Sequence, residues 1–131
     1  MGQDIMTAEP ATRRHILIAD DDPMSRDMLS RRLARQGFAV TTAETGKSAL
    51  SLLETGRFHA VLLDGMMPEM PGLDVLRHLR GAANQTRVIM VTGKALSNDI
   101  EEAMALGADG YVTKPVDFRK LMALIEDEKQ G

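Results

Sequence analysis

The sequence predicts an α/β fold of five βα units, a doubly wound five-stranded parallel sheet with helices on both faces. Three observations support this prediction. Five short apolar runs alternate with segments of helical periodicity, three of the runs are apolar at consecutive positions, and glycines follow several of the helical segments. Consecutive apolar residues are typical of strands that are buried on both faces, as in a parallel sheet covered by helices.

The apolar runs give the expected strands in chain order. They are Ile16–Ala19, Ala39–Ala43, Ala60–Leu63, Val88–Val91 and Tyr111–Thr113. Threonines interrupt the apolar residues of the second run, which indicates a strand at an edge of the sheet.

Helix-start signals follow each expected strand. The candidate caps and first-turn residues are Pro23, Thr45, Gly72, Asn98 and Asp117. In the first helix, Met28, Leu29 and Leu33 recur at helical spacing. Several arginines, among them Arg26, lie on the polar side of this helix, and Gly37 marks its C-terminal end.

Length and composition fit a single domain. The chain has 131 residues, and a hydrophobic fraction of 44% is enough to fill one core. Residues 1–14 carry no periodic apolar pattern, so we expect a flexible N-terminal arm followed by one folded domain over residues 15–131.

The bulk properties exclude several classes of function. A net charge of −3 does not supply the electrostatic footprint of a direct nucleic-acid binder. No run approaches the roughly 20 apolar residues that span a bilayer, and the first residues lack a secretory signal. The absence of cysteine agrees with a reducing compartment. We therefore expect a soluble, cytoplasmic protein with no membrane contact.

Polar residues follow four of the five expected strands. They are Asp20, Asp21 and Asp22 after the first strand, Asp64 after the third, Thr92 after the fourth and Lys114 after the fifth. In an open parallel sheet the carboxyl ends of the strands meet at one edge, where ligands bind. Neighbouring carboxylates repel one another unless a cation neutralises them, and carboxylate oxygens are ligands that Mg²⁺ prefers. A lysine and a hydroxyl beside them suit a transferring phosphoryl group.

Each of these residues also has a simpler explanation. Asp22 can cap a helix beside Pro23, which is the interpretation that we favour for it. Asp64 can form a turn with Gly65, Thr92 suits a strand and Lys114 can be solvated. Their joint position at the ends of βα units favours a common site.

Four segments resemble the receiver domains of two-component response regulators. They are His15–Arg26, Val61–Pro68, Val91–Gly93 and Tyr111–Pro115. The resemblance runs from about residue 15 to about residue 129 and fills all the signature positions of the family. It implies a flavodoxin-like fold with the strand order 2-1-3-4-5.

The resemblance also implies a role for each acidic residue of the site. Asp64 is similar to the phosphoacceptor, whose carboxylate attacks phosphorus to give an aspartyl phosphate. Asp20 and Asp21 resemble the acidic pair that holds Mg²⁺, with Mn²⁺ as an alternative ion. Asp64 and the main-chain carbonyl of Met66 would complete the protein ligands.

Four further positions match the family. The resemblance implies that Thr92 and Lys114 contact phosphoryl oxygens, and that a cis peptide bond before Pro115 directs the lysine inward. Tyr111 matches the aromatic switch residue, which would rotate as Thr92 moves toward the phosphate. This change would remodel the surface of the fourth helix, the fifth strand and the fifth helix.

The implied function is a phosphorylation-dependent signalling switch without turnover of a separate substrate. The phosphodonor would be a histidine kinase or a histidine phosphotransfer protein, and the output a downstream effector or output domain. A second copy of the domain, in a phosphorylation-dependent dimer, is a further possible partner. Arg26, Leu29 and Leu33 are candidate contacts for the phosphodonor, but we favour at least partial packing into the core for Met28, Leu29 and Leu33.

Two alternative functions are open at this stage. The chain can be a docking scaffold that works without phosphorylation, although the complete acid, threonine and lysine set argues against it. Haloacid-dehalogenase phosphatases also use an aspartate at a strand end, but they need a second acid two residues later, where this sequence has Met66. The sequence also leaves open whether the chain is a free-standing receiver or part of a larger regulator.

Overall fold

The structure, a computed structural model that describes residues 14–93 and 97–127, has five parallel strands and five helices in strict alternation. The elements are β2 (His15–Ala19), α1 (Pro23–Arg35), β3 (Ala39–Ala43), α2 (Gly46–Thr55), β4 (Ala60–Asp64), α3 (Gly72–Gly81), β5 (Arg87–Thr92), α4 (Ser97–Ala105), β6 (Gly110–Thr113) and α5 (Phe118–Glu126). The strand order is β3-β2-β4-β5-β6. In chain order this is 2-1-3-4-5, so the predicted fold class is confirmed, and β3 lies at an edge as expected.

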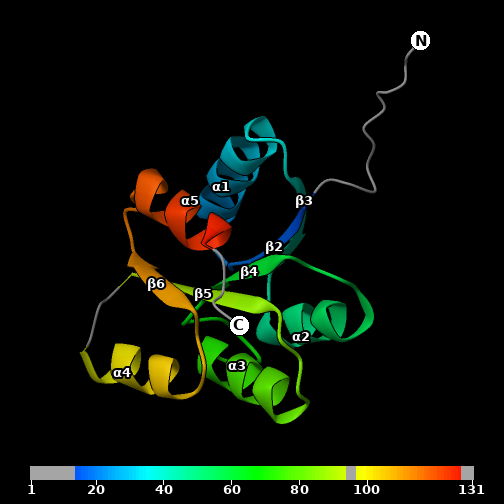
Figure 1. Cartoon of the computed structure of the whole chain (residues 1–131), viewed down its shortest axis with the longest axis vertical. Helices are drawn as coiled ribbons and strands as arrows, with labels where there is room; N and C mark the ends of the chain where they lie inside the picture. Colours follow the sequence, from blue (N-terminus) through cyan, green and yellow to red (C-terminus); the bar gives the residue numbers. More distant parts are fainter. Residues whose placement is uncertain (1–13, 94–96, 128–131) are drawn as a thin grey trace.

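The sheet lies between two layers of helices. Helices α1 and α5 cover one face, and α2, α3 and α4 cover the other (Figure 1). Strand β2 shows how the sequence fills both layers, because Ile16 and Ile18 pack with α1 and α5 while Leu17 and Ala19 pack on the opposite side. Alternate side chains of a strand point to opposite faces, so the consecutive apolar run serves two cores.

The helix starts follow the predicted capping signals. Asp22 caps α1 by accepting a hydrogen bond from Met24 N, and Pro23 lies in the first turn. Thr45 caps α2, and Asp117 caps α5. The expected arm over residues 1–14 lies outside the described residues apart from Arg14, and the side chain of Asn98 is not described. The described part of the chain contains no helix long and apolar enough to cross a membrane.

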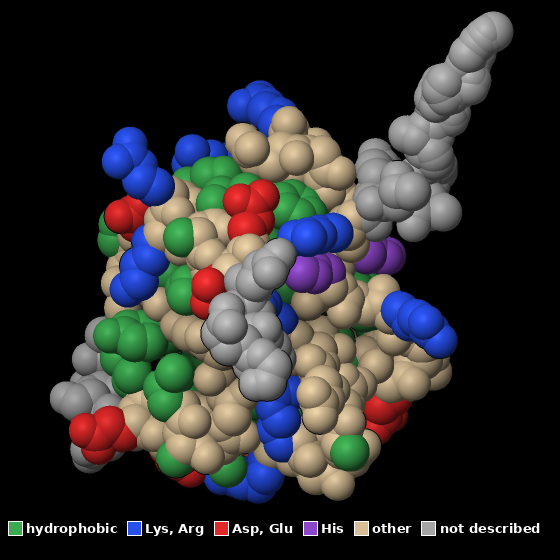
Figure 2. Space-filling view, in the orientation of Figure 1, with side chains coloured by type: hydrophobic (Ala, Val, Ile, Leu, Met, Phe, Trp, Pro, Cys, Tyr) green, Lys and Arg blue, Asp and Glu red, His purple; other side chains and the backbone are tan. Residues whose placement is uncertain are grey.

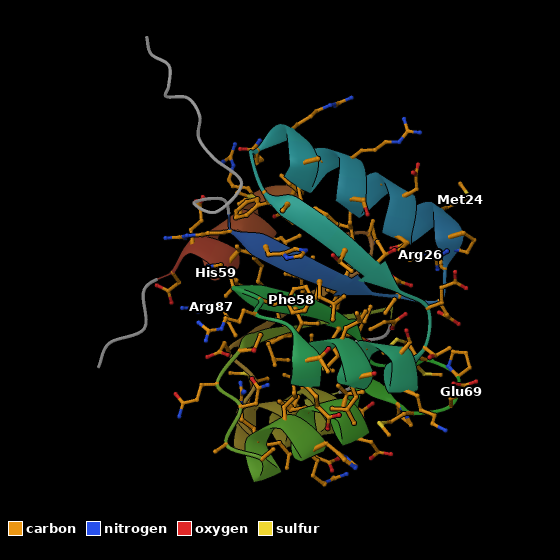
Figure 3. All side chains as sticks on the ribbon, turned by 90° about the vertical axis from the view of Figure 1, so that its right-hand side faces the viewer. Met24, Arg26, Phe58, His59, Glu69 and Arg87 are labelled. Atoms are coloured by element: carbon orange, nitrogen blue, oxygen red, sulfur yellow. The ribbon has the colours of Figure 1, made fainter. Side chains whose placement is uncertain are left out.

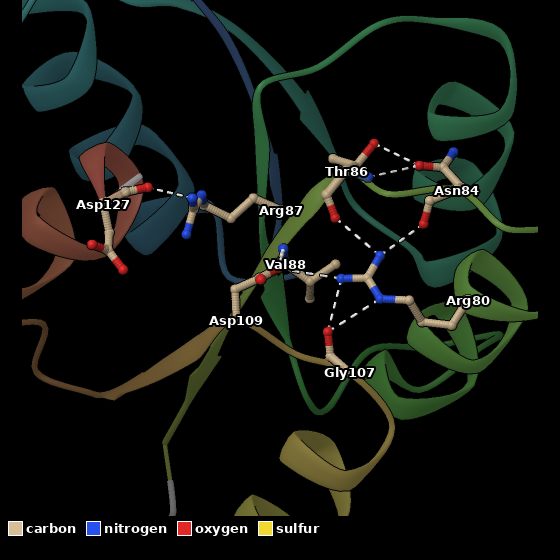
Figure 4. Close-up of polar contacts among 8 residues, drawn as sticks. All are labelled: Arg80, Asn84, Thr86, Arg87, Val88, Gly107, Asp109 and Asp127. Carbon is tan, nitrogen blue, oxygen red and sulfur yellow. Dashed lines mark hydrogen bonds and ion pairs between the residues drawn. The ribbon is translucent and has the colours of Figure 1, made fainter. Parts of the chain in front are cut away.

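An arginine network closes the amino end of the sheet. Arg80 of α3 donates hydrogen bonds to the carbonyl oxygens of Asn84, Thr86 and Gly107 and pairs with Asp109 (Figure 4). These acceptors belong to the α3–β5 and α4–β6 connections. One guanidinium therefore joins the two loops.

The C-terminal end of α5 is held at the same end of the molecule. His59 Nε2 donates a 2.9 Å hydrogen bond to Ile125 O, and Arg87 donates to Asp127 O (Figure 4). Figure 3 shows His59 and Arg87 at the end of the sheet opposite Met24 and Glu69. Figure 2 views this end from outside, where histidine side chains lie among scattered acidic and basic ones. These donors satisfy carbonyl groups that a helix leaves unpaired at its C-terminus.

Candidate functional site

Strand register brings the predicted site residues to the carboxyl edge of the sheet. Ala19 pairs with Leu63, so Asp20 and Asp64 are neighbours at the ends of β2 and β4. Thr92 pairs with Thr113, which places Lys114 just beyond the end of β6 on the same side. Parallel pairing thus gathers residues that are far apart in the sequence.

Three carboxylates form a cluster at this edge. Asp20, Asp21 and Asp64 each offer an oxygen, and these oxygens lie within 4.8 Å of one another. Asp20 and Asp64 are buried, with exposed fractions of 2% and 5%, whereas Asp21 is exposed. The cluster therefore has two buried acids and one at its entrance.

Local backbone bonds hold the two buried carboxylates. Asp22 N donates to Asp20 Oδ1 at 2.9 Å, and Met66 N donates to Asp64 Oδ1 at 3.1 Å. In each case the donor lies two residues after the acid, where an aspartate readily makes a turn. Met66 itself is 76% exposed, so its side chain lies at the rim of the site.

Gly72, the first residue of α3, allows this helix to approach the end of β4. A Cβ atom at Gly72 would lie 2.5 Å from the carbonyl oxygen of Asp64 and 3.1 Å from the Cα of Gly65. Gly72 N also donates a 3.1 Å hydrogen bond to Gly65 O. A residue without a side chain is therefore required where α3 supports the Asp64 turn.

Lys114 supplies the positive charge of the site. Its Nζ lies 3.0 Å from Asp20 Oδ2 and 3.5 Å from Asp64 Oδ2. Its backbone N donates to Thr92 O at 2.8 Å, which ties the end of β6 to β5. The peptide bond between Lys114 and Pro115 is cis, as the sequence comparison with the family implied.

Burial and neighbouring charges shift the pKa values of these groups in different directions. Burial raises the pKa of Asp64 to about 6, and the nearby Asp20 carboxylate adds to this shift, whereas the Met66 N–H and Lys114 oppose it. Burial also acts to raise the pKa of Asp20, but the Asp22 N–H, Lys114 and the Ser25 hydroxyl together lower it. Burial acts to lower the pKa of Lys114, but the two carboxylates raise it. Asp64 is thus the group whose ionised form is costly.

The donor set fits a hard divalent cation. Asp20 Oδ2 is buried and accepts no hydrogen bond of regular geometry from the described residues, and the Lys114 ammonium lies 3.0 Å from it. A buried carboxylate oxygen of this kind has capacity for a metal ligand bond. Oxygen ligands from three acids match the preference of Mg²⁺.

The two predicted switch residues lie on adjacent strands. Thr92 is half-buried at the end of β5, and Tyr111 is half-buried on β6. The ring of Tyr111 packs against the apolar layer under α2, α3 and α4, and Lys120 Nζ lies 4.8 Å from its centre. Thr92 therefore lies at the same edge of the sheet as the acidic cluster, whereas Tyr111 pairs with Met90 and lies two residues before the end of β6.

The structure excludes two of the three candidate phosphodonor contacts on α1 and confirms their packing into the core. Leu29 and Leu33 are 1% and 0% exposed and pack in the core beneath α1, so they cannot contact a partner. Arg26 does not lie on the solvated side of α1 as expected, because its side chain is 17% exposed and reaches Asp20 O. In the sequence, only the position of Arg26 in the first turn of the helix, just after the acidic pair, points to its contact with Asp20 O.

This fold and this acidic site together define the class of the protein. The chain belongs to the response regulator receiver domain family, whose family model matches residues 16–126. It is a receiver domain of two-component systems, a class of phosphorylation-dependent signalling domains rather than of turnover enzymes. This match favours the receiver interpretation over the phosphatase alternative.

Individual relatives agree with this assignment. A probable transcriptional regulatory protein of Picosynechococcus sp. is 35% identical over 125 residues, which cover 90% of this chain and 50% of that protein. A CheY-like receiver domain protein of Methanospirillum hungatei has a TM-score of 0.83 at 32% identity, covering 88% of this chain and 93% of that chain.

A further solved structure carries ligands. It is a response regulator protein from Burkholderia pseudomallei with a phosphorylated aspartic acid, a calcium ion and citrate, with a TM-score of 0.80 at 27% identity over 87% of this chain and 67% of that chain. The chain spans about half the length of the curated relatives it matches, which include probable transcriptional regulatory proteins and a response regulator of Mycolicibacterium vanbaalenii.

Proposed function

We propose that Asp64 accepts a phosphoryl group in a Mg²⁺-dependent reaction and that this modification switches the partner-binding surface of the domain. The observation that carries the proposal is the acidic cluster with Lys114 beside it, at 3.0 Å from Asp20 and 3.5 Å from Asp64. The phosphorylated aspartic acid and calcium ion in the related Burkholderia structure support the same chemistry here.

Asp64 is the nucleophile of the proposed reaction. One of its carboxylate oxygens forms a bond to phosphorus while the bond from phosphorus to the donor nitrogen of a phosphohistidine breaks. The histidine takes up a proton as it leaves. With a pKa of about 6, Asp64 is mostly ionised at neutral pH and so retains the charge needed for attack.

The cation would be held by the carboxylates of Asp20, Asp21 and Asp64 together with the main-chain carbonyl of Met66, and Mn²⁺ could replace Mg²⁺. When bound, it would neutralise negative charge on the phosphoryl oxygens. Lys114 presents its ammonium to the same oxygens, because it already bridges the two buried acids. The hydroxyl of Thr92 donates to a further phosphoryl oxygen. The domain thus catalyses its own phosphorylation and dephosphorylation and turns over no separate substrate.

The proposed output is a change in the surface of α4, β6 and α5. Thr92 and Tyr111 lie on neighbouring strands, so a displacement of Thr92 toward the phosphate leaves room for the ring of Tyr111. Only a few kcal/mol or less would be needed to change the populations of two such states. Partners on this surface would be a downstream effector, an output domain or a second receiver in a phosphorylation-dependent dimer.

The phosphodonor would be a histidine kinase or a histidine phosphotransfer protein. Regulatory relatives roughly twice the length of this chain support a role in which the receiver controls an attached or separate output. The exposed Met24 and Met66 flank the acidic cluster and offer apolar contact area to the donor. The domain would act in the cytoplasm, where such donors present their histidines.

Intact mass spectrometry tests the proposal directly. Protein incubated with Mg²⁺ and a small-molecule phosphodonor should gain one phosphoryl group, and Asp64→Asn should gain none. Asp22→Asn is the matched control, because Asp22 caps α1 outside the cluster and asparagine retains the capping function. It should be phosphorylated like the wild type.

The same experiment distinguishes the phosphorylation switch from the docking-scaffold alternative. An unchanged mass for the wild type, with chelator and Mg²⁺ alike, would support the docking-scaffold alternative. A phosphoryl group on Asp64→Asn would place the acceptor elsewhere and overturn the assignment of Asp64.

A further inference from the structure

Arg26 contacts the backbone of the acidic pair from the first turns of α1. Its Nη1 donates a 2.8 Å hydrogen bond to Asp20 O, and its Nη2 lies 3.6 Å from Glu44 Oε2. Figure 3 shows Arg26 at the same end of the sheet as Met24 and Glu69. The Arg26 side chain is 17% exposed, whereas that of Glu44 is 74% exposed. The guanidinium is therefore largely removed from water and is held between the β2–α1 and β3–α2 connections.

The accepting oxygen belongs to the peptide unit that joins Asp20 to Asp21. A peptide unit is planar, so fixing its oxygen fixes the direction in which the chain enters Asp21. Asp20 N donates to Ala43 O at 3.0 Å, which holds the other side of Asp20. Asp21 is exposed, so no packing holds its side chain, and the backbone sets the direction of its Cα–Cβ bond.

We infer that Arg26 is a positioning residue for the cation site: its bond to Asp20 O holds the Asp20–Asp21 peptide so that the Asp21 carboxylate faces Asp20 and Asp64. Residues that orient metal ligands in this way commonly change metal affinity by about 10- to 100-fold when they are replaced. The inference rests on the proposed function only in taking the acidic cluster as the Mg²⁺ site.

Glu44 has a separate role in the same contact. A guanidinium beside a cation site repels the cation, and a carboxylate 3.6 Å away offsets that repulsion. Removing the Arg26 charge alone would therefore strengthen Mg²⁺ binding, whereas losing its positioning bond would weaken it. The two effects have opposite signs, so the direction of the change identifies the role.

Isothermal titration of Mg²⁺ into the unphosphorylated protein measures this change. We expect Arg26→Met to bind Mg²⁺ at least about 10-fold more weakly than the wild type. Arg26→Lys keeps the charge, but its shorter side chain does not reproduce the guanidinium contact with Asp20 O, so this variant should also bind Mg²⁺ more weakly. Glu44→Gln keeps the bond to Asp20 O, so its affinity should fall by only about 2- to 3-fold, and added salt should reduce that difference because the effect is electrostatic.

Arg31→Met is the matched control. Arg31 lies on the same helix and pairs with Asp27, but its side chain is 71% exposed and does not reach the site. It should bind Mg²⁺ like the wild type. Circular dichroism of each variant without metal reports whether the fold is intact, and Arg26→Lys carries the test if Arg26→Met does not fold.

Equal or tighter Mg²⁺ binding by folded Arg26 variants would overturn the inference. This failure is distinct from a failure of the proposed function. If the wild type binds Mg²⁺ but accepts no phosphoryl group, the proposed function fails while weak binding by Arg26→Met still supports the positioning role. If the wild type is phosphorylated and Arg26→Met binds Mg²⁺ equally well, only the positioning role fails.

Discussion

Replacing Asp64 with asparagine is expected to stabilise the metal-free protein at neutral pH. Burial raises the pKa of Asp64 from its ordinary value of 3.8 to about 6. The folded state therefore binds the proton more tightly than the unfolded chain does, and ionisation of Asp64 costs folding free energy. Asparagine keeps an oxygen that can accept from Met66 N and carries no charge.

The magnitude follows from the size of the shift. A change of about two pKa units corresponds to roughly 3 kcal/mol at full ionisation, since each unit is about 1.4 kcal/mol. Relaxation of the site and its contact with solvent reduce this value, so we expect Asp64→Asn to raise the free energy of unfolding by about 1 to 3 kcal/mol at pH 7. The contribution of Asp64 to stability is largest below pH 3.8 and is lost as the pH rises through about 6.

Urea unfolding in the presence of a chelator, between pH 4 and pH 8, measures this difference. The gap between Asp64→Asn and the wild type should widen from pH 4 to about pH 6 and then stay constant. Glu54→Gln removes an exposed carboxylate of α2 and serves as the control for net charge. Added Mg²⁺ should stabilise the wild type more than Asp64→Asn, because a ligand that binds only the folded state shifts the unfolding equilibrium. A pH-independent gap, or a destabilised Asp64→Asn, would refute the reasoning.

Three further predictions concern the elements that support the site. Gly72→Ala should lower the free energy of unfolding in urea by about 1 to 3 kcal/mol and slow phosphorylation, because its Cβ would overlap Asp64 O. Gly81→Ala is the control and should not lower the free energy of unfolding, because nothing lies within 4 Å of its Cβ. Asp22→Ala should cost about 1 kcal/mol by removing the cap of α1, and an unchanged urea midpoint would contradict that role. Leu121→Ala should cost about 2 to 5 kcal/mol, because Leu121 is fully buried under α5, and a smaller loss would mean that the core collapses around the cavity.

The positions of the acids could be predicted from sequence because a parallel sheet has a simple geometry. Each βα unit ends its strand at the same edge, so Asp20 and Asp64 had to lie at one edge of the sheet once their strands were assigned, and the pairing of β2 with β4 makes them neighbours. The edge position of β3 was predicted from the threonines that interrupt its apolar residues. The order of the central strands did not follow from periodicity and was implied only by family resemblance.

Contacts between distant side chains and backbone were not predictable from the sequence. Arg26 occupies a polar helix position, where a solvated side chain is the usual expectation, and only the course of the β2–α1 loop reveals its acceptor. Helical periodicity did favour the packing of Leu29 and Leu33 into the core, and both are buried. By contrast, the close approach at Gly72 depends on where α3 meets β4.

The Arg80 network has a consequence for how α4 can move. Arg80 binds Gly107 O, two residues beyond the end of α4, and also anchors the turn before β5. The C-terminal end of α4 is thereby held against α3, whereas no contact between Arg80 and the first turn of α4 is found among the residues that the structure describes. Any rearrangement of α4 should therefore have its largest displacement at the end of the helix nearest the acidic cluster, and amide hydrogen exchange should be slower near Gly107 than in the first turn of the helix.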